Sequence, residues 1–242
     1  MGHMKRAEMP ASGATVQPVI CNLAGQRLGR KGRETRERIL AATAELLAEG
    51  PETAVSLSEI ARRASLGMTS LYLYFTDLTE LLLAALEPIM ASAEQAYVGH
   101  LRQRWPDQDM QGHCVAFVRK YHGFWYQHAR ILHLRNNMAD AADIRMLEHR
   151  LRSAVPLIEL LTRQMDRDPG ATSSPAYAIA TALFIGLDRL VAVRTDAGMA
   201  RRLGNPDNRV LPNRLLAQAR LMELGIRDAR TGADFDLQFP TG

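Results

Sequence analysis

Apolar residues near the start of the chain recur at steps of three and four from about Arg33 onward. Spacing of this kind places side chains on one face of an α-helix. The pattern stops near Gly50-Pro51, a pair that ends helices. We therefore predict a helix with one buried face that ends near residue 50. The residues that carry the pattern are Ile39, Leu40, Thr43, Leu46 and Leu47.

A second helix has two independent start signals around Ser56. Ser56 can accept a hydrogen bond at the helix N-terminus, and Glu59, three positions later, can reach back to complete a capping box. Val55 and Ile60 occupy the two positions of a hydrophobic staple. Together these signals predict a helix over residues 57–64.

A turn-like Ser65-Leu66-Gly67 follows, and then a short helix is predicted over Met68–Tyr74. Asp77 is placed to cap a long helix, with Glu80 at the position that would close a second capping box. Two short helices joined by a tight turn that contains glycine, behind a longer support helix, have the layout of a helix-turn-helix that reads DNA.

Beyond residue 77 the apolar pattern is helical throughout. No segment alternates apolar and polar residues as an amphipathic strand does, so we expect an all-α chain, with Pro88 and Pro156 kinking two helices. The predicted helices cover residues 78–104, 110–134, 141–166, 175–195 and 209–224. Turn-forming residues separate them, at Trp105-Pro106-Asp107, Asn136-Asn137, Asp168-Pro169-Gly170 and Asn205-Pro206-Asp207.

Positive charge is concentrated at the N-terminus. Residues 1–38 hold eight Lys or Arg against three Glu, whereas the whole chain of 242 residues has a formal net charge of +4. A cationic arm suits a polyanion partner, and an ordinary solvated basic terminus explains the charge equally well. Residues 1–29 show no periodicity and are predicted to be disordered. Met1–Met4 resemble a cloning remnant.

The composition favours a globular protein of the cytoplasm. Apolar residues make up 47% of the chain, an ordinary share for a soluble domain. We identify neither an apolar run long enough to cross a bilayer nor a secretory leader, and we expect no membrane partner. Cys21 and Cys114 lie far apart, without the spacing of a zinc site or a disulfide framework, which suits a reducing compartment.

The stretch from Arg33 to about Leu83 resembles the N-terminal domain of the TetR family of bacterial transcriptional regulators. Residues 70–75, Ser-Leu-Tyr-Leu-Tyr-Phe, stand where that family carries a Thr-Leu-Tyr-aromatic-His-Phe type of sequence. Four positions depart from the family pattern. Ser65 replaces a glycine, Gly67 a serine or similar cap, Thr69 a glycine or proline, and Leu78 a lysine that would contact phosphate. The other matching residues are Arg38, Ile39, Leu40, Ala42, Leu46, Gly50, Val55, Ile60, Ala61, Ala64, Leu71, Tyr72, Phe75 and Leu81.

The resemblance implies a three-helix DNA-binding domain and a C-terminal helical bundle. The expected division is a basic arm at 1–30, the helix-turn-helix domain at 31–77, an effector-binding and dimerisation domain at 78–228 and a tail at 229–242. In such a fold the second helix of the motif enters the major groove, and flanking groups bind phosphate. The residues assigned to DNA in this way are Lys31, Arg33, Ser56, Ser58, Met68, Thr69, Ser70, Tyr72 and Tyr74.

An aromatic stretch in the C-terminal part is the candidate lining of an effector pocket. Several of its side chains share one helical face, which is equally typical of an ordinary core stripe. The composition favours an apolar or aromatic small molecule, with Arg135 and Arg152 as candidate polar partners. The predicted ligand-binding residues are Phe117, Tyr121, Phe124, Trp125, His128, Met138 and His149.

Helix 175–195 is apolar nearly all round, so it must be covered on most sides. The family pairs two such C-terminal helices with their copies in a homodimer, and burial inside a single protomer is the alternative. A dimer would present two heads to successive major grooves about 34–36 Å apart on a pseudo-palindromic operator. The predicted interface residues are Ala182, Ile185, Leu187, Leu190, Leu215 and Met222.

These features predict a ligand-responsive DNA-binding regulator, a repressor that leaves double-stranded DNA when its effector binds. The alternatives are a DNA-binding regulator without an effector and an all-α enzyme, for which Asp140, Asp143 and His149 are the nearest candidates. We expect no enzyme activity, no cofactor and no metal. The three histidines His122, His128 and His133 are too unevenly spaced to share one helical face.

Overall fold

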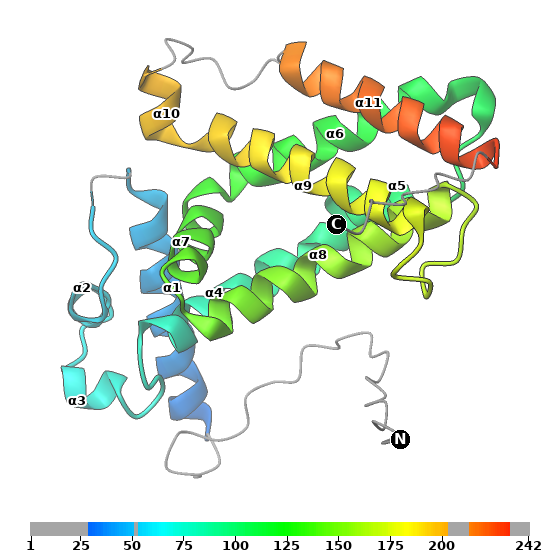
Figure 1. The fold of residues 1–242 in the computed structure, drawn as a ribbon. Coiled ribbons are helices and arrows are strands. Elements are labelled where there is room, and N and C mark those ends of the chain that lie inside the picture. The colour runs from blue at the N-terminus through cyan, green and yellow to red at the C-terminus, as the bar shows by residue number, and fades with distance from the viewer. Residues whose placement is uncertain (1–28, 51–52, 203–212, 233–242) are drawn as a thin grey trace, which may run out of the picture.

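Every element that the computed structural model describes is a helix (Figure 1). The described residues are 29–50, 53–202 and 213–232. Across these ranges there is no strand, which confirms the predicted all-α class. The predictions for most of the basic arm, for the turn Asn205-Pro206-Asp207 and for the last ten residues lie outside the described residues.

Three helices form a head at one end of the molecule: α1 (Arg30–Ala48), α2 (Leu57–Arg63) and α3 (Met68–Leu71). Figure 1 shows α2 and α3 at the outer edge of the head, away from the body. This arrangement is the predicted helix-turn-helix. A separate apolar cluster holds the head together, made of Ile39, Ala42, Leu46, Ile60, Ala61, Ala64, Leu71, Phe75 and Leu81.

Local capping fixes the start of α2 as predicted, although the capping box is only half formed. Ser56 Oγ accepts a hydrogen bond from the Glu59 N–H at 3.3 Å. The Glu59 carboxylate, which should reach back to the helix start, instead accepts from Arg62 and Arg63 at 2.6–3.1 Å. Because an ion pair with two arginines is available one turn later, the carboxylate turns away from the cap.

The third helix is shorter than the predicted 68–74. It ends at Leu71, and the chain continues as turns in which the Phe75 N–H donates to the Leu71 carbonyl at 3.1 Å. Asp77 then caps α4 (Leu78–Ala93) by accepting from the Glu80 N–H at 2.9 Å. The Glu80 carboxylate accepts from the N–H of Thr76 at 2.6 Å, so this second box closes one residue earlier than predicted.

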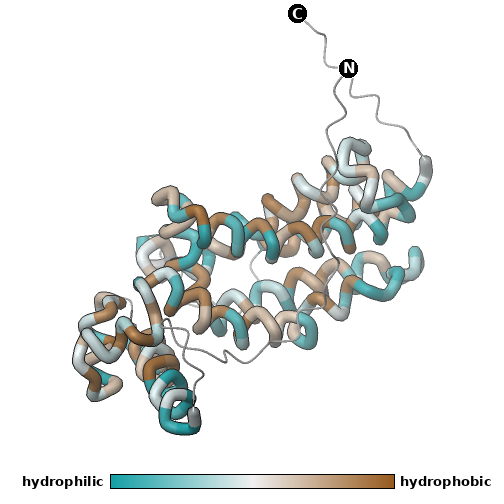
Figure 2. The backbone as a smooth tube through the Cα atoms, turned by 90° about the horizontal axis from the view of Figure 1, so that it is seen from below, coloured by the Kyte–Doolittle hydropathy of each residue, from teal (hydrophilic) through white to brown (hydrophobic). Residues whose placement is uncertain are grey.

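The remaining helices form an elongated body, seen beside the head in Figure 2. The predicted helix 78–104 is interrupted by a π-helical turn, η1 (Glu94–Val98), before α5 (Gly99–Arg102). A short 3-10 turn, η2 (Asp107–Asp109), leads into the next helices. These are α6 (Met110–Gln127), α7 (Ala129–Asp140), α8 (Ile144–Gln164), α9 (Pro175–Thr195), α10 (Ala197–Arg202) and α11 (Asn213–Arg230).

Two predicted boundaries in the body are wrong. Residues 110–134 do not form one helix, because the chain breaks at His128, whose backbone leaves the helical region (φ −116°, ψ 21°). Conversely, α7 runs straight through Asn136-Asn137, which had been predicted as a turn. The turn comes at residues 141–143, where Ala142 has a φ of 67°. Asparagine favours turns, but here the packing of α7 against α8 holds the pair helical.

The fourth helix belongs to both parts of the molecule. Leu81 lies in the apolar cluster of the head, whereas Leu82 and Leu86 lie in the larger cluster of the body. Leu78, which stands where the TetR family carries a lysine, packs against both clusters. An apolar residue here therefore serves the joint between head and body, which explains the departure from the family pattern.

Polar contacts fasten the same joint at two places. Arg130, in the first turn of α7, donates from Nη1 to the Leu46 carbonyl at 2.6 Å and also bonds the carbonyls of Glu49 and Thr53. At the start of α4, Arg145 pairs with Asp77 at 2.8 Å. These contacts hold the head in one orientation relative to α7 and α8.

The ninth helix is long and apolar enough to cross a bilayer by length and composition, contrary to the prediction that no such run exists. Only 33% of its most apolar window is buried within the protomer. It nonetheless packs against α6, α8 and α11, and Asp188 near its middle accepts a hydrogen bond from the Tyr121 hydroxyl at 2.6 Å. A polar bond of this kind is typical of a helix in a bundle core.

The turn between α2 and α3 places a serine where the backbone favours glycine. Ser65 has a φ of 53°. It follows the last residues of α2, where Leu66 N–H donates to the Ala61 carbonyl at 2.9 Å and Ser65 N–H to the Arg62 carbonyl at 3.2 Å. This bonding pattern is that of a Schellman motif, which usually has glycine at the left-handed position.

Replacing Ser65 with glycine should therefore stabilise the protein. A left-handed conformation costs a residue with a Cβ atom about 1 kcal/mol, which glycine avoids. The greater conformational freedom of glycine in the unfolded chain offsets part of this stabilisation. We expect Ser65→Gly to raise the midpoint of urea denaturation and the matched Ser65→Ala, which keeps the Cβ atom, not to raise it. Equal midpoints for the two variants would contradict this interpretation.

Candidate functional site

The outer face of the head carries exposed polar side chains on α2 and α3. Thr69 is exposed, Ser70 is half-buried, and Ser58 on α2 is exposed. Tyr72, just after α3, is 48% exposed. None of these side chains is covered by the body, so the short third helix is free to approach a partner through its first turn, as a helix that reads DNA must.

Other residues that were assigned to DNA have structural roles as well. Met68 and Tyr74 are half-buried and pack against the head cluster. Ser56 Oγ caps α2 and lies 3.1 Å from Ser58 Oγ. Lys31 and Arg33 lie exposed on the first turns of α1. The candidate face that remains most open therefore consists of Thr69, Tyr72 and Ser58.

Two exposed residues of the same face were missed. Leu73 follows Tyr72 and is 48% exposed, and Arg62 lies on the exposed side of α2, paired with Glu59 at 2.6 Å. The two arginines that bind Glu59 lower the pKa of its carboxyl to about 2. Arg62 could have been identified from the sequence, because opposite charges three residues apart on a helix predict a contact between the two side chains.

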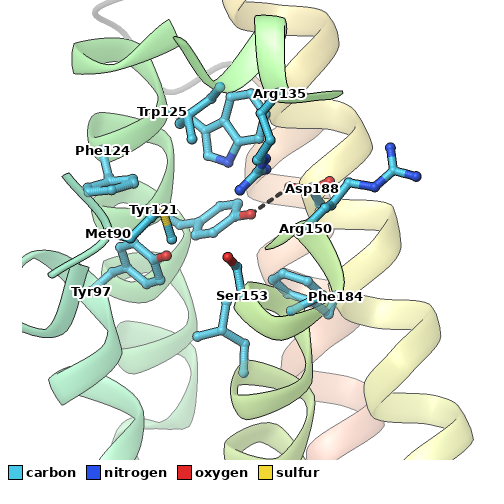
Figure 3. Close-up of a pocket in the computed structure, with 13 residues that line it drawn as sticks. Met90, Tyr97, Tyr121, Phe124, Trp125, Arg135, Arg150, Ser153, Phe184 and Asp188 are labelled. Atoms are coloured by element: carbon cyan, nitrogen blue, oxygen red, sulfur yellow. Dashed lines mark hydrogen bonds between the residues drawn. The ribbon is translucent and has the colours of Figure 1, made fainter. Parts of the chain in front are cut away.

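A small cavity of about 30 Å³ lies in the body between α4, α6, α7, α8 and α9 (Figure 3). Its lining combines aromatic rings with a few polar groups, as ligand sites commonly do. The space holds only about two waters at ~15 Å³ each. The lining residues are Met90, Tyr97, Tyr121, Phe124, Trp125, Leu132, Arg135, Arg150, Ser153, Ala154, Leu157, Phe184 and Asp188.

The structure brings Tyr121, Phe124 and Trp125 of the predicted ligand residues together at this cavity, with Arg135, the predicted polar partner. Phe117 has the alternative role, a core residue that is fully buried, with its ring centroid 6.2 Å from that of Trp105. The predictions for the other ligand residues find no support in the lining, which does not include Met138, His128 or His149.

One of these residues lines a different hollow. His128 borders a cavity of about 370 Å³ between α1, α4 and the junction of α6 with α7, together with Leu40, Ala44 and Pro88. The His128 ring still packs against the Phe124 ring, with the two centroids 4.9 Å apart, but it borders this second cavity and not the small one.

The polar groups of the small cavity come from five separate segments, η1, α6, α7, α8 and α9. The Tyr121 hydroxyl donates to Asp188 at 2.6 Å, and Arg150 pairs with Asp140 at 2.7 Å. Burial raises the pKa of both the Tyr121 and Tyr97 hydroxyls, so both stay neutral hydrogen-bond donors. Sequence reasoning missed Tyr97 and Asp188 because no local pattern links residues so far apart in the chain.

A histidine beside the cavity is held neutral. His149 Nδ1 is buried without a hydrogen-bond partner among the described residues. Burial, with the charges of Arg135 and Arg152 adding to it, lowers the pKa of His149 to about 4. A neutral imidazole against two cations avoids a repulsion that protonation would create.

Exposed apolar side chains of the body lie on α9 and α11, which pack against each other, and also on α8, at Ile144, Leu151 and Val155. Ile185 on α9 is 58% exposed, and Leu221 and Leu224 on α11 are 55% and 46% exposed. Ala182, predicted for the interface, is exposed, and Leu190 is half-buried. Leu216, Leu221 and Leu224 of α11 were not assigned to the interface from the sequence.

Three of the predicted interface residues are corrected by the structure. Leu187, Leu215 and Met222 are at most 1% exposed and pack in the body cluster. A fully buried side chain cannot contact a second protomer, so these residues hold α9 and α11 to their own protomer. Both helices carry exposed apolar side chains, but these three, one on α9 and two on α11, point into the protomer.

Within the part of the chain that the structure describes, no three His, Cys, Asp or Glu side chains are grouped so that they could hold a metal ion. Cys114 is a free thiol in the body core, and burial raises its pKa to about 12. A thiol in this state is unreactive.

Comparison with known families places the head in context. Residues 39–85 match the family of bacterial regulatory proteins of the tetR family, which confirms the resemblance seen in the sequence of the head. No curated protein matches the chain.

Three solved structures are similar in fold over 84–85% of this chain. One is a TetR-family transcriptional regulator from Mesorhizobium loti MAFF303099, at 16% identity over 98% of its length, with a TM-score of 0.52. The others are a TetR-like transcriptional regulator from Rhodococcus sp. RHA1 (20% identity, 100% of its length, TM-score 0.48) and a TetR-family regulator from Streptomyces coelicolor A3 (23% identity, 99% of its length, TM-score 0.43). The Mesorhizobium protein shares the fold of head and body together.

The depressed pKa of His149 predicts a pH dependence of stability. Between the ordinary value of 6.5 and about 4, the unfolded chain binds a proton at this imidazole and the folded chain does not. The free energy of unfolding should therefore be highest above pH 6.5 and fall as the pH drops towards 4. Urea denaturation across this range should show a shallower fall for His149→Gln, and an unchanged slope in that variant would contradict the assignment.

Proposed function

We propose that this chain, whose residues 39–85 match the bacterial regulatory proteins of the tetR family, is a homodimeric transcriptional repressor of the cytoplasm that releases its operator when a small molecule binds the body. The observation that carries the proposal is the outward-facing helix-turn-helix. Thr69 and Tyr72 are exposed at the outer edge of a head whose orientation is fixed by Arg130 and by the Arg145–Asp77 pair.

DNA reading requires small polar side chains at base edges and hydroxyl or cationic groups at phosphates. Thr69 and Ser70, on the first turn of α3, supply hydrogen-bonding groups that suit several bases. Tyr72 presents its hydroxyl beside them, and Ser58 lies near the N-terminus of α2, where free amides favour an anion. Lys31 and Arg33 on α1 add positive charge on the head.

Release by a ligand is supported by the path from the cavity to the head. Met90, on α4, lines the cavity, and the first turns of the same helix lie in the head cluster through Leu81. A ligand that widened the cavity would move α4 against α8 and thereby change the angle of the head. Such a ligand shifts the population away from the DNA-binding conformation by its differential affinity for the two states.

A homodimer is supported by the apolar surface of α9 and α11. The side chains of Ile185, Leu221 and Leu224 would leave an exposed apolar patch on a lone protomer, and patches of this kind mark interfaces. A twofold pairing of these two helices with their copies forms a four-helix contact and directs two heads toward the same face of DNA.

A regulator without an effector is the second candidate, and the small volume of the cavity favours it. A space of about 30 Å³ is far below the ~300 Å³ of a typical ligand pocket. Under that alternative no small molecule would alter the melting temperature or the affinity for DNA. Measuring the melting temperature and the DNA affinity with and without small aromatic carboxylates decides between the two candidates.

Removing the Tyr72 hydroxyl should weaken DNA binding. We expect Tyr72→Phe to lower the affinity for a DNA fragment selected from a random pool by roughly three- to tenfold, because one hydrogen bond is worth about 1 kcal/mol. Fluorescence anisotropy measures the affinity. Tyr126→Phe is the matched control, since Tyr126 is 47% exposed on the body. An unchanged affinity in Tyr72→Phe, or an equal loss in the control, would contradict the assignment.

A charge in the apolar surface of α11 should dissociate the dimer. Leu221→Arg would bury an unpaired cation in the proposed contact, a penalty of several kcal/mol. Size-exclusion chromatography with light scattering should show a dimer for the wild type and a monomer for this variant. Leu151→Arg on α8, where Leu151 is 53% exposed, should remain dimeric. A monomeric wild type would refute the proposed assembly.

A further inference from the structure

The small cavity contains a buried cation whose hydrogen-bonding capacity is largely unused. Arg135 is only 5% exposed. Its Nε donates to Asn136 Oδ1 at 3.1 Å, and its guanidinium carbon lies 5.9 Å from the centroid of the Trp125 ring. Among the described residues, Nη1 and Nη2 make no hydrogen bond or ion pair, although the negative charge of Asp188, which lines the same cavity, favours the charged guanidinium. Figure 3 shows the guanidinium pointing into the cavity, toward the Tyr121 hydroxyl.

An arginine in this state is strongly unfavourable without a partner. Arginine stays protonated inside proteins, and its guanidinium carries five N–H donors in a planar fork. Burying such a charge unpaired costs far more than burying an apolar side chain of similar size. The Asp188 carboxylate lines the same cavity and favours the charge, but it makes no ion pair with the guanidinium and instead accepts from the Tyr121 hydroxyl. The terminal N–H donors of Arg135 are therefore available to an anionic group that enters with the ligand.

The neighbouring charges limit that anion to a single negative charge. Arg150 is paired with Asp140 at 2.7 Å, and Figure 3 shows its guanidinium directed away from the cavity. Asp188 is held by the Tyr121 hydroxyl at 2.6 Å. A dianion such as a phosphate monoester would meet one free cation and the repulsion of the Asp188 carboxylate, whereas a monoanion would be balanced by Arg135.

The walls around this cation are aromatic. The Tyr97 and Phe124 ring centroids are 5.1 Å apart, and Tyr121 and Phe184 are 5.8 Å apart, both pairs edge to face. Together with Trp125, whose ring lies next to the guanidinium, they line the cavity. Rings of this kind bind another ring by stacking or edge-to-face contact.

We propose that the ligand of this cavity is a small aromatic carboxylate whose two carboxylate oxygens bind the terminal nitrogens of Arg135. A planar carboxylate matches the fork of a guanidinium in a bidentate pair. The ring lies among Tyr97, Trp125 and Phe184. The inference rests on the proposed function in one respect, because it takes this cavity as the effector site.

Entry of such a ring requires the cavity to widen, and the lining shows where it yields. Met90 is an unbranched, flexible side chain, half-buried on α4, whereas the aromatic residues around it are rigid. Displacement of Met90 makes room with little loss of packing. The same displacement pushes on α4, which connects the cavity to the head.

Binding of carboxylates and their neutral amides to the purified full chain tests the proposal. The probes are benzoate, phenylacetate and 1-naphthoate, each compared with the corresponding amide of the same size. At least one carboxylate should raise the melting temperature and give a dissociation constant at least about tenfold below that of its amide, as expected for charge-assisted hydrogen bonds. No binding of any carboxylate at millimolar concentration, or equal binding of the amide, overturns the proposal.

Variants of Arg135 separate a ligand role from a structural one. Arg135→Met should abolish carboxylate binding while the ligand-free protein still unfolds cooperatively. Arg135→Lys should weaken binding by about tenfold, since an ammonium lacks the bidentate fork. Arg163→Met, at an exposed arginine of α8 outside the lining, is the matched control. It should bind the carboxylate within about threefold of the wild type. Carboxylate binding that survives in Arg135→Met contradicts the assignment.

Measuring DNA affinity on the same samples distinguishes failure of this inference from failure of the proposed function. Carboxylate binding through Arg135 without any DNA binding would support an aromatic carboxylate as the ligand and contradict the proposed repressor function. DNA binding that is released by the neutral amide as effectively as by the carboxylate would retain the repressor and reject the ligand class.

Discussion

Of the contacts that orient the head, those of Arg130 complete the end of its support helix. Arg130 donates to the carbonyls of Leu46, Glu49 and Thr53, which lie at and just beyond the end of α1. The last turn of any helix leaves carbonyls without partners inside the helix, and here an arginine from the body satisfies them. The end of the support helix is thus completed by α7. Since α2 packs on α1 and α3 packs on α2, the position of the proposed DNA-binding face is set by contacts made far from that face.

Helix α7 connects the joint between head and body to the cavity. Arg130 and Arg135 are five residues apart on α7, the first bound to the head and the second directed into the cavity (Figure 3). A ligand that binds Arg135 and displaces Met90 therefore acts on both helices that hold the head, α7 and α4. Coupling between the sites then needs no long chain of intermediates, because each helix is a rigid element shared by both. Arg145 fastens α8 to the start of α4 and keeps the three helices moving together.

Sequence reasoning succeeded where the cause is local. The start of α2 follows from the Ser56 cap, and the whole length of α9 follows from its apolar run and from turn residues on either side. It failed where packing decides: Asn136-Asn137 stays helical against α8, and the break at His128 carries no turn signal. The cavity was half predicted, because Tyr121, Phe124 and Trp125 share one helix, whereas Tyr97 and Asp188 meet them only through the tertiary fold. On α11, apolar residues occupy several faces, so the sequence did not reveal which face the core would take.

The distance between the two heads of a dimer tests most directly whether the joint sets their position. Spin labels at Ser58→Cys, in a chain that also carries Cys21→Ser and keeps the buried Cys114, report this distance by pulsed electron paramagnetic resonance. We expect a single narrow distance distribution in the ligand-free protein and a broad one once Arg130→Ala removes the cap on α1. A distribution that is equally narrow in both proteins would show that Arg130 does not hold the head in place.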